Sequence, residues 1–189
     1  RPRDDPRVAE FDRFVAAGGT PLRQFALFEA IAAAHPREPW HRWPVDLRGP
    51  AAPGVADFAG RHAHRIRFAL YLQWLADRQL AAAADRARAG GLAWGYFRDL
   101  AVGAAPDGAE PWANADGFAR GASIGAPPDP FSPTGQNWGL PPPIPHAMTA
   151  SAGAGFRQLV AANMRHAGAL RIDHVMGLSR LFWIPEGAD

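Results

Sequence analysis

Ala169-Leu-Arg-Ile-Asp-His-Val-Met-Gly177 alternates apolar and charged side chains between Leu170 and Asp173. The alternation predicts a strand over 169–173 that directs Leu170 and Ile172 to one face and Arg171 and Asp173 to the other. An arginine beside a carboxylate orients it and favours its charged form. A carboxylate fixed in this way can attack an anomeric carbon. The same alternation also fits an ion pair with a purely structural role, and taken alone it favours that interpretation.

The residues before this strand predict an α/β fold with parallel strands. A helix that ends at Gly168 precedes the strand, and residues 92–98 predict a second, buried strand with Asp99 at its C-terminal edge. Helices that alternate with strands are typical of parallel sheets. A parallel barrel places its working residues at the C-terminal ends of strands, and Asp99 and Asp173 both occupy such ends.

Start and stop signals predict helices in the first half of the chain. These helices run from Asp5-Pro6 to Gly18-Gly19, from Thr20-Pro21 to His35-Pro36, and from Val55 or Gly60 to Ala89, the last with Ile66, Leu70 and Trp74 as its buried stripe. Prolines predict a loop over 36–54. Residues 101–150 are expected to form a long connection without secondary structure, and such connections are commonly functional. Residues 178–183 predict a short apolar helix that Pro185 stops.

The segment Ala126-Pro-Pro-Asp-Pro-Phe-Ser-Pro-Thr-Gly-Gln-Asn-Trp-Gly-Leu-Pro-Pro142 combines stiff prolines with Asp129, Gln136, Asn137 and Trp138. Sugars bind to this mixture, because an aromatic face covers the apolar side of the ring while amides and carboxylates bind the hydroxyls. A packing lid with one tryptophan is an equal alternative. Of the other tryptophans, three are expected in the core and three in loops as weaker sugar platforms: Trp74, Trp94 and Trp183, and Trp40, Trp43 and Trp112, respectively.

Histidines and short motifs give no sign of a metal or cofactor. His174 alone is more often structural, although beside a strand-end Asp173 it can donate to a substrate hydroxyl. His62 and His64 would diverge on a helix, and no other histidine shows ligand spacing. Gly153-Ala-Gly155 lacks the dinucleotide fingerprint, and neither a nucleotide-phosphate loop nor a Gly-x-Ser-x-Gly elbow is present. We therefore expect no metal and no cofactor.

Composition bounds the class of protein. The chain has 189 residues, of which 48% are hydrophobic, so it can bury a sizeable core. Its pI of about 9.9 accompanies a net charge of only +2, because every basic side chain other than histidine is arginine. The arginines are dispersed among acids, which argues against a nucleic-acid partner. The chain has no apolar run long enough to span a membrane and no apolar export signal at its start, so a cytoplasmic location is the default expectation.

Four segments together resemble one known family. They are Tyr96-Phe-Arg-Asp-Leu-Ala-Val-Gly103, Gly121-Ala-Ser-Ile-Gly-Ala-Pro-Pro-Asp-Pro130, Gly135-Gln-Asn-Trp-Gly-Leu-Pro-Pro142 and Asn163-Met-Arg-His-Ala-Gly-Ala-Leu-Arg-Ile-Asp-His-Val-Met-Gly177. In this order and spacing they resemble 4-α-glucanotransferase, the bacterial amylomaltase or disproportionating enzyme of glycoside hydrolase family 77. The resemblance implies a partial (β/α)8 TIM barrel with helical and loop insertions. It implies a mainly helical segment over 1–90, and barrel strands with the glucan-binding loop and the nucleophile strand over 91–189.

The resemblance also implies an activity and a site. The enzymes cleave an α-1,4-glucan and transfer the released segment to the 4-hydroxyl of another glucan, with retention. The nucleophile falls on Asp173, supported by Arg171. The substrate-binding residues implied are Asp99, Asp129, Gln136, Asn137, Trp138 and His174. The expected partner molecule is a maltodextrin, with neither a nucleic acid nor a membrane involved.

The family also uses a glutamate acid/base and a further aspartate, in motifs that this chain lacks; Glu186 does not match the first of them. We therefore expect the chain to be a fragment that is inactive alone. Its remaining partners would be the rest of a longer chain, with a homodimer possible. An α-glucan hydrolase of the same clan and a non-catalytic glucan-binding piece are the alternative functions.

Overall fold

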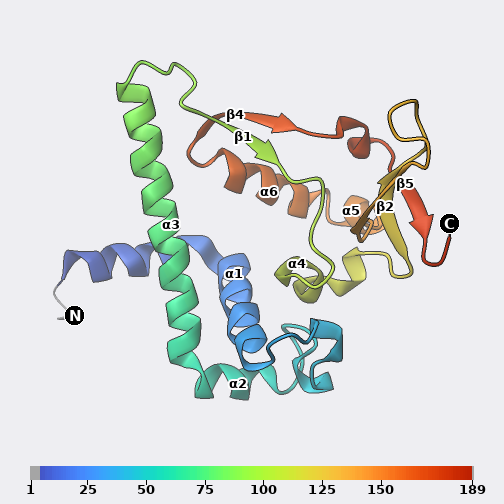
Figure 1. Ribbon diagram of the computed structural model, residues 1–189. Coiled ribbons are helices and arrows are strands. Elements are labelled where there is room, and N and C mark those ends of the chain that lie inside the picture. Colours follow the sequence, from blue (N-terminus) through green and yellow to red (C-terminus); the bar gives the residue numbers. More distant parts are fainter. Residues whose placement is uncertain (1–4, 189) are drawn as a thin grey trace. The chain divides into compact units, whose positions relative to one another are not determined.

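The computed structural model describes residues 5–188. Its internal contacts divide the chain into two compact units, Arg1–Ala83 and Ala84–Asp189 (Figure 1). Helices build the first unit, whereas the second combines helices with two sheets. The fold is thus of the α/β kind.

The first unit begins with α1 (Pro6–Ala34), in which Gly19 breaks the helical geometry with φ 57° and ψ −147°. Asp5 caps the helix by accepting a hydrogen bond from the backbone N–H of Arg7 at 2.9 Å. The predicted break at Gly18-Gly19 is confirmed as a kink at Gly19, and the two predicted helices form one element on either side of it. The chain then continues through 3-10 turns at Trp40–Arg42 and Val45–Leu47, α2 (Val55–Arg61) and α3 (Ala63–Ala89).

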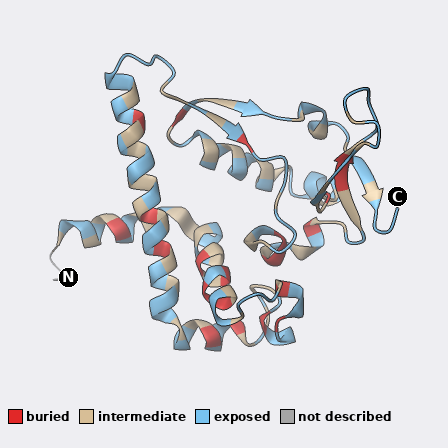
Figure 2. Cartoon of the chain, viewed as in Figure 1, coloured by how far each residue is buried: buried red, intermediate tan, exposed pale blue. Residues whose placement is uncertain are grey.

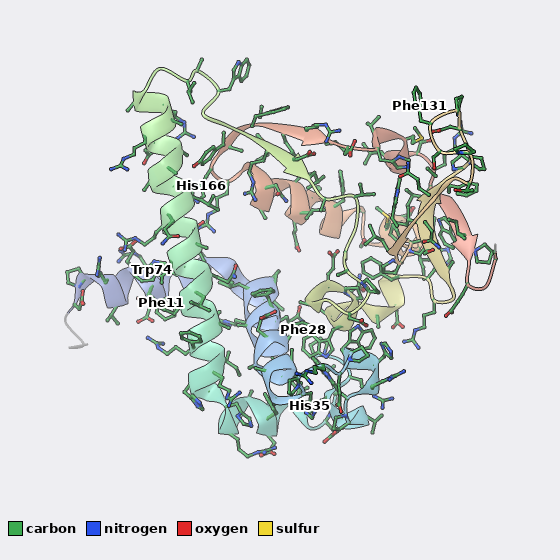
Figure 3. All side chains as sticks on the ribbon, viewed as in Figure 1. Phe11, Phe28, His35, Trp74, Phe131 and His166 are labelled. Atoms are coloured by element: carbon green, nitrogen blue, oxygen red, sulfur yellow. The ribbon has the colours of Figure 1, made fainter. Side chains whose placement is uncertain are left out.

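Aromatic side chains form the core of this unit. Trp74 is 3% exposed, and its ring meets that of Phe11 edge to face at 5.8 Å (Figure 3). Phe28 packs on Trp43 at 5.3 Å, and the Trp43 indole donates to the carbonyl of Glu38. The expectation that Trp40, Trp43 and Trp112 are sugar platforms is wrong, because the first two are buried in this unit and Trp112 is buried in the second.

In the second unit, β1 (Tyr96–Leu100) pairs in parallel with β4 (Ala167–Ile172), with Asp99 opposite Arg171. Helix α6 (Ala154–Met164) packs against both strands. Among residues 5–188, β1 and β4 are the only strands paired in parallel. The strand begins at Tyr96 and not, as the sequence predicts, at residue 92. Trp94 therefore lies before the strand, and it is 72% exposed instead of lying in the core. Figure 2 shows that most of β1 and β4 is not buried.

The second sheet is antiparallel, in the order β3-β2-β5. Its strands are β2 (Ala122–Ala126), β3 (Gln136–Leu140) and β5 (Phe182–Pro185). The helices α4 (Ala109–Ala113) and α5 (Pro145–Ala150) and a 3-10 turn at Ala115–Gly117 complete the connection between β1 and α6.

Two predictions fail in this region. Residues 101–150 hold regular elements instead of a connection without secondary structure. Residues 178–183 do not form a helix, because Phe182, Trp183 and Ile184 pair with β2 as a strand; Trp183 is accordingly partly exposed and not in the core. Aromatic and β-branched side chains favour a strand wherever a partner edge is available.

We expect Trp74→Ala to loosen the first unit, because removal of a buried tryptophan costs about 3–5 kcal/mol. Hydrogen–deuterium exchange of peptides from 63–89 should accelerate by about a hundredfold or more if the unit opens cooperatively. The half-exposed Leu72 on the same helix gives the control: Leu72→Ala should leave exchange nearly unchanged. Equal exchange in both variants would show that Trp74 does not hold this core.

Gly125 sets the spacing of the antiparallel sheet. A Cβ at this position would collide with the backbone carbonyl of Gln136 on β3 and with the Ile184 side chain on β5. We expect Gly125→Ala to destabilise the sheet by about 1–3 kcal/mol, measured as faster exchange in peptides from 122–126 and 136–140. Gly155→Ala on α6, where an added Cβ meets nothing within 4 Å, is the matched control and should not accelerate exchange.

Candidate active site

A single guanidinium joins the C-terminal ends of the two parallel strands. Arg171 donates from Nη1 to Oδ2 of Asp99 at 2.5 Å and from Nη2 to Oδ1 of Asp173 at 2.8 Å. The register that places Asp99 opposite Arg171 makes the first contact possible across 72 residues of sequence. All three side chains remain about half exposed, with relative exposures of 48% for Arg171, 60% for Asp99 and 51% for Asp173. The cluster therefore lies open to a ligand.

Asp173 lies one residue beyond the end of β4 and not within the strand. Its Oδ1 also accepts a hydrogen bond from the backbone N–H of His174 at 3.0 Å. His174 adopts a left-handed conformation, with φ 47° and ψ 51°, and the chain turns there into the 3-10 segment Val175–Leu178. Two donors thus fix one carboxylate oxygen, which leaves the orientation of Asp173 well defined.

Asp173 and His174 line a cavity of about 430 Å³. Apolar side chains from other elements, including Val102, Met148 and Phe156, form the remaining walls. Reasoning from the sequence did not identify Val102, Met148 or Phe156 as lining residues, because only the folded chain brings them together. A polar cluster at the rim of an apolar cavity is the usual form of a small-ligand site.

The tryptophan of the proline-rich segment 126–142 contacts this cluster. Trp138 meets the His174 ring edge to face, with centroids 4.8 Å apart and an interplanar angle of 87°. Its indole Nε1 donates to Oε1 of Gln136 at 2.9 Å. Asn137 Oδ1 accepts from the Ser123 hydroxyl at 2.7 Å and from the backbone N–H of Gly139 at 2.9 Å. Ser123 is a support that the sequence did not reveal, since only the antiparallel pairing brings it to Asn137.

Asp129 is occupied within its own loop. Its Oδ1 accepts hydrogen bonds from the backbone N–H groups of Phe131 and Ser132 at 2.8 and 2.7 Å. This side chain shapes the turn between β2 and β3, and it does not line the cavity next to Asp173. The structure thus gathers Asp99, Arg171, Asp173 and His174 and keeps Asp129 apart from their hydrogen bonds.

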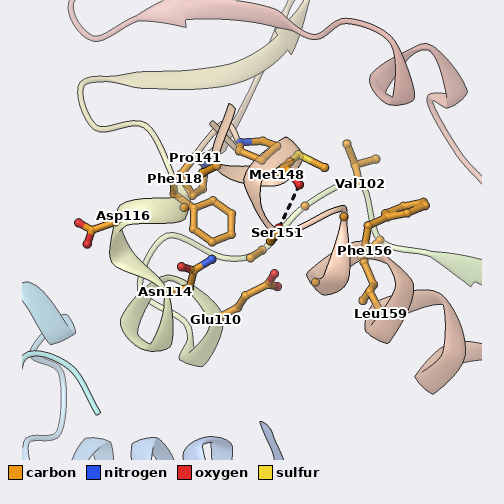
Figure 4. A pocket seen from close by; sticks show the side chains of 18 residues that line it. Val102, Glu110, Asn114, Asp116, Phe118, Pro141, Met148, Ser151, Phe156 and Leu159 are labelled. Atoms are coloured by element: carbon orange, nitrogen blue, oxygen red, sulfur yellow. Dashed lines mark hydrogen bonds between the residues drawn. The ribbon is translucent and has the colours of Figure 1, made fainter. Parts of the chain in front are cut away.

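A second cavity, of about 330 Å³, shares the side chains of Val102, Met148 and Phe156 with the first (Figure 4). Glu110 and Asn114 bring polar groups to it. Although Glu110 keeps contact with solvent, burial of its carboxyl raises its pKa above the ordinary 4.5. The two cavities thus form adjoining spaces with a common apolar wall.

Residues 5–188 hold no group of three or more His, Asp or Glu side chains placed to bind a metal ion. Within the same range, none of the helices combines the length and the apolar character needed to cross a bilayer.

Residues 1–189 match the family of 4-alpha-glucanotransferases, glycoside hydrolase family 77. A 4-alpha-glucanotransferase of Mycobacterium bovis is 46% identical over 187 residues, which are 99% of this chain and 26% of that protein. One of Haemophilus influenzae is 38% identical over 94% of this chain. The crystal structure of amylomaltase from Corynebacterium glutamicum superposes with a TM-score of 0.76 and 36% identity, covering 98% of this chain and 24% of that one.

The chain belongs to this family of glucan-processing enzymes. It spans about a quarter of the length of these two curated relatives. The resemblance drawn from the four sequence segments is confirmed.

We expect Arg171→Lys to weaken the site, because an ammonium group cannot hold two carboxylates in the fixed planar geometry of a guanidinium. Amide exchange of peptides from 96–100 and 167–174 should then accelerate by about tenfold, or ~1.4 kcal/mol, because the bridge that joins the two strand ends is loosened. Arg98→Lys is the matched control: Arg98 neighbours Asp99 on β1 but donates to the carbonyl of Asn163. Equal acceleration of exchange in both variants would show that the bridge has no special role.

Proposed function

We propose that this chain supplies the nucleophile strand of a 4-α-glucanotransferase, which moves an α-1,4-glucan segment to the 4-hydroxyl of an acceptor glucan or glucose with retention. The observation that carries the proposal is the Arg171 bridge between Asp99 and Asp173. Membership of the family supports the same reaction. The bridge orients a carboxylate at the rim of a cavity, which is what a glycosyl transfer through a covalent intermediate needs.

In this proposal Asp173 attacks through Oδ2. The hydrogen bonds from Arg171 and His174 both end on Oδ1, and no donor in the described part of the chain reaches Oδ2. The Oδ2–C1 bond forms as the glycosidic C1–O bond breaks, and the leaving oxygen takes a proton from an acid. The acceptor 4-hydroxyl then attacks C1, the Oδ2–C1 bond breaks, and the hydroxyl proton returns to the conjugate base.

The acid must be a carboxyl about 5–5.5 Å from the nucleophile in a retaining enzyme. Asp99 does not suit this role, because its carboxylate is bound to Arg171. We therefore assign the acid to a glutamate that the family carries outside the motifs of this chain. Alone, the chain is expected to bind glucan without transferring it.

The substrate-binding residues complete the proposed site. Asp99 and His174 would contact the sugar at the cleavage point. Arg171 links Asp99 to Asp173, and the backbone N–H of His174 donates to Asp173. Trp138, Gln136 and Asn137 would line the glucan groove from the β3 side, and Asp129 would shape the loop as well as meet the sugar.

The finer architecture is also a proposal. A partial (β/α)8 barrel would continue the parallel pairing of β1 and β4, with residues 1–90 as the mainly helical segment and 91–189 as the strand and loop segment. Phe97 on β1 is 68% exposed and Ile172 on β4 is also exposed, so further barrel strands of a longer chain, or a second copy, would cover them. A cytoplasmic location stays a prediction.

Incubation with maltotriose separates the three candidate functions. A full-length transferase should yield longer maltodextrins together with glucose, whereas a hydrolase of the same clan should yield mainly shorter sugars. A non-catalytic binding piece should leave the substrate intact. Chromatography of the products gives the answer for the full-length protein and for the isolated chain, and mainly hydrolytic products from the full-length protein would contradict the proposal.

We expect Asp173→Asn to reduce kcat of the full-length enzyme at least about a thousandfold, or ~4 kcal/mol of transition-state stabilisation. The amide keeps the shape of the side chain but lacks the charge that attacks C1. Asp85→Asn is the matched control, because Asp85 is also held by an arginine, Arg88, at 3.1 Å on the exposed face of α3. Near-normal turnover of the Asp173 variant would overturn the nucleophile assignment.

A further inference from the structure

We propose that Trp138 is a positioning residue, whose indole holds the His174 ring and, through the His174 backbone, the orientation of Asp173. The proposal rests on the proposed function, because it concerns the same nucleophile. It differs from the role of a sugar platform, in which Trp138 would act on the substrate alone. The contacts of both rings carry the argument.

The contact between Trp138 and His174 joins two separate sheets. Trp138 lies on β3 of the antiparallel sheet, whereas His174 follows β4 of the parallel sheet. The rings meet nearly at right angles, at 87° and 4.8 Å. This edge-to-face arrangement is the favourable one for aromatic pairs, because the positive ring edge meets the negative ring face.

Trp138 is itself firmly held. The Gln136 side chain fixes the indole through Nε1, and the Asn137 side chain accepts hydrogen bonds from Ser123 on β2 and from the backbone N–H of Gly139 on β3. The indole therefore has a fixed direction before any glucan binds.

The backbone and the ring of His174 both need a contact that holds them in place. Its left-handed backbone conformation is unfavourable for a side chain with a Cβ atom. Its Nε2 is buried and has no hydrogen-bond partner in the structure, so no polar contact at that nitrogen holds the ring. The edge-to-face contact with the Trp138 indole therefore supplies a restraint on the ring that hydrogen bonding at Nε2 does not.

Displacement of the His174 ring reaches the nucleophile through one peptide group. The backbone N–H of His174 donates to Oδ1 of Asp173, the oxygen that Arg171 also binds. If the ring lost its support, the left-handed turn would relax and this donor would move. Asp173 would then be held by Arg171 alone, and its attacking oxygen would be less well aimed.

Kinetics of the full-length enzyme separate positioning from stacking. We expect Trp138→Leu to lower kcat for maltotriose about tenfold, or ~1.4 kcal/mol, with KM changed less than about threefold. Trp138→Phe keeps an aromatic edge and should restore most of kcat. Trp94→Leu is the matched control, because Trp94 is an exposed tryptophan that precedes β1, whereas the site lies at the C-terminal end of that strand; its kcat should not change. A rise in KM at constant kcat would show a sugar platform and overturn the proposal.

A spectroscopic readout tests the contact without activity. In enzyme labelled with 13C at histidine Cε1, the His174 resonance is identified by its loss in His174→Gln. Trp138→Leu should shift this resonance by removing the indole ring current, while Trp138→Phe should shift it less and the His166 resonance should stay in place. An unshifted His174 resonance would overturn the proposal. The proposed function has a separate test: an Asp173→Asn variant that stays active would contradict it, whatever the result for the Trp138 variants.

Discussion

The organisation of the second unit depends on a guanidinium placed between two carboxylates. Arg171 reaches Asp99 only because β1 and β4 run in parallel with these residues in register, and it reaches Asp173 only because the chain turns directly after β4. Charge-assisted hydrogen bonds from one planar group are directional. The bridge therefore joins two strand ends that lie far apart in the sequence, and it orients Asp173 where that residue lines a cavity.

The antiparallel sheet adds a second constraint from the other side of the site. Gly125 lets β3 and β5 approach β2 closely, which brings the anchored Trp138 to the turn after β4. His174 is thereby held between a backbone bond to Asp173 and an aromatic contact from β3. The site is thus a junction of two sheets, each of which fixes one part of it.

The local signals in the sequence predicted much of this structure. Asp5, Gly19 and His35 mark helix ends, because capping and left-handed geometry depend on neighbouring residues. The strand with Arg171 and Asp173 was predicted from its alternation. The antiparallel sheet was missed, because prolines and glycines interrupt any period in 101–150 and its pairings join residues far apart. Trp94 and Trp183 were misplaced for a related reason: aromatic character indicates burial only when a covering element is present, and both are exposed here.

The direct test of the central claim is to trap the covalent intermediate. The full-length enzyme would be treated with an α-maltosyl fluoride that carries a second fluorine on its reducing ring, digested with trypsin and examined by mass spectrometry. The account predicts an adduct on peptide 172–180, in which Asp173 is the only carboxylate side chain. An adduct on peptide 99–120, which begins at Asp99, or on any other carboxylate, would contradict it.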